Sequence, residues 1–171
     1  MNDLLPRLTY VLCASLMLVS CGSGSRSDRA SDDVAFSTLP AQFYEPGLGD
    51  LMSVLQLRHA KLWYAAEADN WPLVDFELHE IEETFERIAR WHPEEHGMPV
   101  APALEGYMRA AHEALETSAA NEDRAGFEAA FDLFTAGCNA CHRAMKHGFI
   151  VIQRPTREPV TNQRWALQVD G

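Results

Sequence analysis

The stretch that decides the fold is residues 121–149, NEDRAGFEAAFDLFTAGCNACHRAMKHGF. Apolar side chains recur through it at steps of three and four, which is the period of an amphipathic α-helix. This stripe comprises Phe127, Phe131, Phe134, Cys138, Cys141 with His142, Met145 and Phe149. We expect the helix to open at Asn121, with Glu122 and Asp123 in its first turn, where the helix dipole favours anions. Gly148 is placed to end it in a left-handed conformation.

Three further helical patterns precede this one. The first is expected from about Gly49 to Ala68, the second after the N-cap residue Asn70, and the third after Pro102. Each presents one apolar stripe that it cannot bury alone, and short links favour antiparallel neighbours. We find no strand-like period of two in this region. The sequence therefore predicts an all-α, up-down-up-down antiparallel four-helix bundle over residues 48–149.

The N-terminal residues 1–20 are typical of a secretory signal, because a positively charged start precedes an apolar run too short to span a bilayer. The run ends in LVSCG, residues 18–22, which resembles the lipobox of bacterial lipoproteins. The resemblance implies cleavage before Cys21, lipid on that cysteine, and a protein exported and anchored facing the periplasm. Gly22 is not the aspartate associated with inner-membrane retention, so we expect the outer membrane. The alternative is ordinary secretion, with Cys21 an incidental free thiol.

Two segments flank the bundle. Residues 21–47 are expected to form a flexible tether, rich in Ser, Gly, Arg and Asp, followed by an extended proline-bearing segment. Residues 150–171, broken by two prolines, are expected to run back over the surface as a C-terminal tail.

The charge balance restricts the partners. The 171 residues include 14 Lys and Arg against 25 Asp and Glu, a formal net charge of −11. Nucleic acid is therefore excluded as an expected ligand, because phosphate binding needs clustered basic side chains. A basic protein is the partner that best matches such a surface.

One motif carries chemistry. Residues 138–142, CNACH, form the C-x-x-C-H haem-attachment pattern. Two thiols at i and i+3, Cys138 and Cys141, add across the two vinyl groups of a haem. His142 at i+4 returns to the same helix face and presents an imidazole to the iron. Gly137 just before the motif removes a side chain where we expect the cofactor edge to approach closely.

Three other interpretations of this motif compete with haem attachment. A disulfide between Cys138 and Cys141 suits helical geometry poorly. A thioredoxin-like redox pair expects its first cysteine at a helix N-terminus, which lowers the thiol pKa, whereas this pair lies deep in a helix or near its end. A zinc site would need at least one more well-placed histidine.

The sixth ligand position of such a haem decides its chemistry. In an antiparallel bundle His142 faces the early half of the first helix, where Met52 and His59 lie on the core stripe. We prefer His59, which lies mid-helix at a position where a structural residue would ordinarily be Leu or Ala, although a satisfied core histidine is the common role of such a residue. Met52 is the alternative, since Met/His ligation is also established, although methionine commonly fills gaps in cores. An open sixth position is the third possibility.

A four-helix bundle with C-x-x-C-H near the end of its last helix resembles the class II c-type cytochromes, the cytochrome c-prime group. The resemblance rests on the architecture and on Cys138, Cys141 and His142. It implies one covalent haem c in the bundle core with His142 as the proximal iron ligand, and it admits a homodimer, since such bundles pair through helix faces. The chain departs from that group in its lipobox, its tail and its ligand-capable residues on the facing helix.

The expected function follows from the sixth ligand. With a protein side chain in that position, the chain is expected to be a membrane-tethered monohaem electron carrier and not an enzyme, working with a redox partner protein. Two alternatives stay open. One is a five-coordinate haem protein that binds NO, CO or similar small gases. The other is a non-haem accessory lipoprotein.

Overall fold

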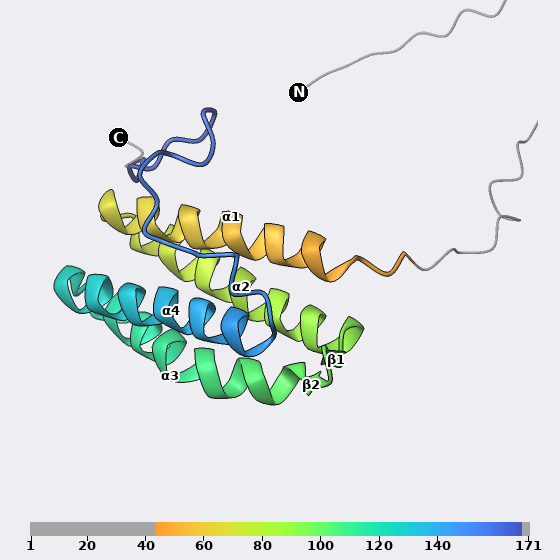
Figure 1. Ribbon diagram of the computed structural model, residues 1–171. Helices are drawn as coiled ribbons and strands as arrows, with labels where there is room; N and C mark the ends of the chain where they lie inside the picture. The colour runs from red at the N-terminus through yellow and green to blue at the C-terminus, as the bar shows by residue number, and fades with distance from the viewer. Residues whose placement is uncertain (1–43, 169–171) are drawn as a thin grey trace, which may run out of the picture. The chain divides into compact units, whose positions relative to one another are not determined.

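A computed structural model describes residues 44–168 of the chain (Figure 1). The expected signal peptide, the expected lipidation site Cys21 and almost all of the expected tether lie outside these residues. The described part contains four helices, α1 (Leu48–Glu67), α2 (Trp71–Trp91), α3 (Val100–Ala120) and α4 (Arg124–Ala144), and two short strands, β1 (Glu94–Glu95) and β2 (Met98–Pro99). The prediction of an all-α fold is therefore confirmed at the level of secondary structure. None of the helices within residues 44–168 is long and apolar enough to cross a membrane.

The helices pack in chain order, α1 along α2, α2 along α3 and α3 along α4, while α1 and α4 contact each other much less closely. Between them lies one apolar core. Its largest fully buried side chains include three phenylalanines of α4 and aliphatic residues of the other helices: Phe127, Phe131, Phe134, Leu62, Leu78, Ile81, Ile88 and Leu115. Burying each of these contributes about 1.5–3 kcal/mol, so the stripes predicted from the sequence supply most of the packing.

The start of α2 follows the prediction, because the Asn70 side chain accepts a hydrogen bond from the Leu73 N–H at 3.2 Å. The predicted starts of α3 and α4 were wrong. Helix α3 begins at Val100, before Pro102, since a proline in the first turn lacks only an N–H that has no helical acceptor. Helix α4 begins at Arg124, because Asp123 is its N-cap and accepts from the Gly126 N–H at 3.1 Å.

The end of α4 also differs from the prediction. The helix stops at Ala144, and Lys146, at φ 63°, adopts the left-handed conformation that we expected of Gly148. The His147 N–H donates to the His142 carbonyl at 2.7 Å and the Lys146 N–H to the Arg143 carbonyl at 3.2 Å. This is a Schellman motif built on a lysine. The chain therefore turns away early, which leaves Phe149, expected on the apolar stripe, 79 % exposed.

A small hairpin joins α2 to α3, contrary to the expectation that this region lacks strands. Strands β1 and β2 pair antiparallel, with Glu95 opposite Met98. The two residues between them, His96 and Gly97, have φ values of 51° and 80°, the positive values of a type I′ hairpin turn. Two paired residues on each side are too few to show a period of two.

The segment after α4 crosses back over α4 and α1 (Figure 1). Asn139 exchanges two hydrogen bonds with the backbone of Ile152, at 2.7 and 2.8 Å. Arg154 pairs with Asp132 at 2.6 Å. Further along, the Trp165 carbonyl accepts from the Asn70 side chain at 2.7 Å, and the buried Trp165 ring contacts Tyr64. These contacts hold the tail across the opening between α1 and α4.

Candidate functional site

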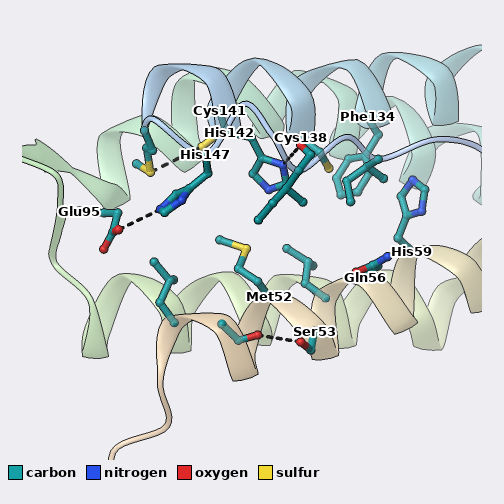
Figure 2. A pocket seen from close by; sticks show the side chains of 16 residues that line it. Met52, Ser53, Gln56, His59, Glu95, Phe134, Cys138, Cys141, His142 and His147 are labelled. Atoms are coloured by element: carbon teal, nitrogen blue, oxygen red, sulfur yellow. Dashed lines mark hydrogen bonds and ion pairs between the residues drawn. The ribbon is translucent and has the colours of Figure 1, made fainter.

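Where α1 and α4 separate, they enclose a cavity of about 370 Å³, open to one side (Figure 2). This volume is in the range of ligand sites, which are typically apolar with a few polar groups. Its lining comes from α1, from α4 and the segment after it, and from the hairpin: Leu48, Gly49, Met52, Ser53, Leu55, Gln56, His59, Glu95, Phe134, Cys138, Cys141, His142, Met145, His147, Ile150 and Ile152. All the described residues that the sequence singled out as haem ligands or attachment points are in this set.

The two cysteines of the motif are free thiols on the cavity wall. Burial, with a smaller contribution from Cys141, raises the pKa of Cys138 to about 12, and burial also raises the pKa of Cys141. Cys141 lies 4.0 Å from the sulfur of Met145. Both thiols are therefore neutral near pH 7, which is the opposite of the thiolate that a thioredoxin-like pair requires.

The ring of His142 is oriented by the backbone that follows α4. Its Nδ1 lies 3.0 Å from the carbonyl oxygen of Ile150. Because a carbonyl can only accept, Nδ1 carries the proton, and Nε2 of the neutral ring keeps its lone pair. The Ile150 N–H in turn donates to the His147 carbonyl at 2.9 Å. The tight turn after Ala144 thus sets the tautomer that leaves Nε2 available to a metal.

His59 is a buried histidine whose Nε2 already has a hydrogen-bond partner. Its Nε2 lies 2.9 Å from Thr135 Oγ1, and its ring centre lies 4.4 Å from that of Phe131. The Thr135 hydroxyl donates its only proton to the Phe131 carbonyl at 2.8 Å. Its oxygen therefore accepts a hydrogen bond from the Nε2–H of His59. Burial lowers the pKa of His59 to about 4, so the ring is neutral near pH 7. His59 is therefore a buried neutral histidine with Nε2 bonded to α4.

Contacts between α1 and α4 fix which residues face one another. Arg124, at the start of α4, pairs with Glu67, at the end of α1, at 2.9 Å, so the two helices run in opposite directions. His59 stands opposite Thr135, and His142 lies two turns beyond Thr135, about 10.5 Å along the axis. Counting the same seven residues back along α1 from His59 leads to Met52. Figure 2 shows the Met52 side chain across the cavity from His142, with His59 at the far end beside Phe134.

Gly137 has a different role from the one expected. A Cβ at this position would lie 2.4 Å from the carbonyl oxygen of Tyr107 and 3.1 Å from the sulfur of Met108, both on α3. Gly137 is not among the residues that line the cavity. It therefore permits close approach of α3 to α4, and the expectation that it makes room for a cofactor edge was wrong.

Two residues that are distant in the sequence come together at one end of the cavity. Glu95, on β1, and His147, after α4, lie 2.9 Å apart between Oε1 and Nε2. Both line the cavity. They are separated by 52 residues in the chain, so no local spacing signals their contact.

The donor set of the cavity fits a covalently attached haem. Two neutral thiols at i and i+3 and one imidazole with its Nε2 available lie on a single apolar wall, and a thioether side chain faces them. Comparison of the chain with family models, with characterised proteins and with solved structures finds no match.

Proposed function

We propose that this protein is a monohaem c-type cytochrome that carries electrons. Its proposed architecture is the up-down-up-down four-helix bundle, with the haem held between α1 and α4. The observation that carries the proposal is the convergence of Cys138, Cys141 and His142 on one apolar cavity, with the Ile150 carbonyl fixing the protonated nitrogen of His142. The bundle is supported by helices that pack in chain order and by the opposite directions of α1 and α4.

Several residues would each have a different role in binding the haem. Cys138 and Cys141 would form the two thioether bonds, and His142 Nε2 would be the proximal ligand. The Ile150 carbonyl orients the imidazole and increases its basicity by accepting from Nδ1. When bound, a haem supplies a one-electron redox couple. The apolar lining, with Phe134 and Met145, excludes water around it.

Met52 replaces His59 as the preferred sixth ligand. Two observations support this choice: the helix register puts Met52 at the level of His142, and His59 Nε2 is already bonded to Thr135. A thioether sulfur paired with an imidazole raises the reduction potential of a haem relative to two imidazoles. A six-coordinate iron has no open position for a substrate, which agrees with an electron carrier and not an enzyme.

The proposal includes export. With residues 1–20 removed and Cys21 lipidated, the domain would be tethered to a membrane facing the periplasm, the outer membrane in preference to the inner. Its acidic surface suits a basic redox partner, because the net charge of −11 steers an oppositely charged protein toward it.

Visible absorption spectra test this function. The protein is produced in a host able to attach haem c, and its oxidised and reduced spectra are recorded with and without CO. We expect low-spin bands that CO does not perturb. A high-spin spectrum altered by CO would instead support the gas-binding alternative, and a protein without haem absorption would support the accessory lipoprotein.

A further inference from the structure

Three ligand-capable side chains meet where the β1–β2 hairpin contacts the end of α4, and two of them, Glu95 and His147, line the end of the cavity. His147 Nε2 lies 2.9 Å from Glu95 Oε1, and His96 Nε2 lies 3.3 Å from the same oxygen. The ligand atoms of all three residues lie within 4.8 Å of one another. Figure 2 shows the Glu95–His147 contact as a dashed line. The cluster thus joins two segments that are distant in sequence.

The backbone on both sides of this cluster is fixed. His96 occupies the first position of the type I′ turn, at φ 51°, and Glu95 is paired with Met98 in the hairpin ladder. His147 follows the left-handed Lys146, and its N–H is bonded to the His142 carbonyl at 2.7 Å. Ligands whose backbones are held in this way lose little freedom when an ion binds, which favours affinity.

We infer that Glu95, His96 and His147 form a binding site for a divalent transition metal of the zinc class. Tetrahedral zinc with bonds of about 2.0–2.1 Å to nitrogen and oxygen holds its ligand atoms about 3.3 Å apart. The two distances to Glu95 Oε1, 2.9 and 3.3 Å, are close to this spacing. Water would complete the fourth position. Mg²⁺ and Ca²⁺ fit poorly, because they take oxygen ligands and two of these three donors are imidazole nitrogens.

The site is separate from the proposed haem ligands. His142 directs its Nδ1 to Ile150, and neither nitrogen of that ring is bonded to the Glu95 cluster. A metal bound by Glu95 and His96 in the hairpin and by His147 after α4 would connect these two distant parts of the chain to each other. Binding is therefore expected to raise the melting temperature.

Calorimetric titration of Zn²⁺ into the chelator-treated, haem-loaded full chain tests the site. The variants are Glu95→Gln, His96→Ala, His147→Ala and the double variant His96→Ala with His147→Ala. The matched control is His79→Ala, which removes an exposed histidine 3.4 Å from Glu83 on α2. Removing even a partner of a metal ligand costs about 10–100-fold in affinity, so we expect at least a tenfold loss in each single variant.

We expect one equivalent of zinc to bind the unaltered protein and the control, no saturable binding to the double variant, and a zinc-dependent rise in melting temperature that the double variant lacks. Zinc X-ray absorption should show two imidazole ligands. The inference is overturned if the unaltered protein binds no zinc with saturation. It is equally overturned if the double variant binds as tightly as the control, or if the bound zinc has no imidazole ligand.

Discussion

The side chain of His59 on α1 is hydrogen-bonded to Thr135 on α4, with 2.9 Å between Nε2 and Oγ1. This contact aligns two antiparallel helices that otherwise meet little, and it leaves Met52 opposite His142. The same contact gives His59 a structural role, since the hydroxyl of Thr135 is itself bonded to the Phe131 carbonyl. The chemistry assigned to the cavity depends on this alignment.

Replacing Met52 by Leu should open the sixth coordination position of the proposed haem, because leucine has a similar volume but no sulfur to bind iron. We expect the oxidised spectrum to change from low spin to high spin and the reduced protein to bind CO. His59→Asn is the matched control on the same helix, because its amide can still donate a hydrogen bond toward Thr135 but is a poor ligand for haem iron, and this variant should stay low spin. The reverse pattern, with only His59→Asn becoming high spin, would show that His59 is the ligand.

The free energy of unfolding should depend on pH through His59. Its pKa is about 4 in the folded chain and about 6.5 in an unfolded one, so the unfolded chain binds the proton more tightly. The stabilisation is complete above pH 6.5 and is lost as the pH falls toward 4, by on the order of 3 kcal/mol.

Urea unfolding at pH 7, 6 and 5 measures this dependence. The decrease should be smaller in His59→Asn, whose side chain does not titrate, than in the control His79→Asn, which removes an exposed histidine. An equal decrease in both variants would show that groups other than His59 cause the dependence.

Gly137→Ala should destabilise the fold without changing the spectrum of the proposed haem. Its Cβ would meet the Tyr107 carbonyl at 2.4 Å, and overpacking of this kind costs about 1–3 kcal/mol. Gly106→Ala in α3 is the matched control, because a Cβ there meets nothing within 4 Å and alanine favours the helix by about 1 kcal/mol. Thermal unfolding distinguishes them. If the two variants were equally stable, Gly137 would not be needed for the close packing of α3 and α4.

Electron transfer with a basic redox protein should slow as salt is added. The net charge of −11 attracts such a partner, and ions screen that attraction over about 10 Å at 0.1 M. Stopped-flow kinetics with a basic cytochrome at increasing ionic strength provides the measurement, with an acidic redox protein as the control. A rate independent of salt for the basic partner would rule out electrostatic steering.

The sequence predicted the helices well because their apolar stripes are long and regular. The stripe through Phe127, Phe131 and Phe134 is buried as its spacing indicates. Helix ends were less predictable, since Asn121 and Asp123 are both suitable caps. The structure uses Asn121 to end α3 and Asp123 to begin α4. Local spacing cannot decide between two such neighbours.

The site was predictable only where its residues are adjacent in the chain. Cys138, Cys141 and His142 are one motif, and they share one cavity wall. Met52 and His59 lie on the same stripe of α1, so their order of preference depends on the alignment of α1 with α4, which follows from a contact between residues 76 positions apart. The Glu95–His147 contact could not be predicted from the sequence for the same reason, because the two residues are 52 positions apart.

Mass spectrometry of the denatured mature chain tests the central claim most directly, because thioether bonds survive denaturation. The protein is made in a host able to attach haem c, next to a Cys138→Ala, Cys141→Ala double variant. We expect the mass of the processed, lipidated polypeptide plus one haem, with the haem mass absent from the double variant. A mass equal to the polypeptide and its lipid alone would contradict it.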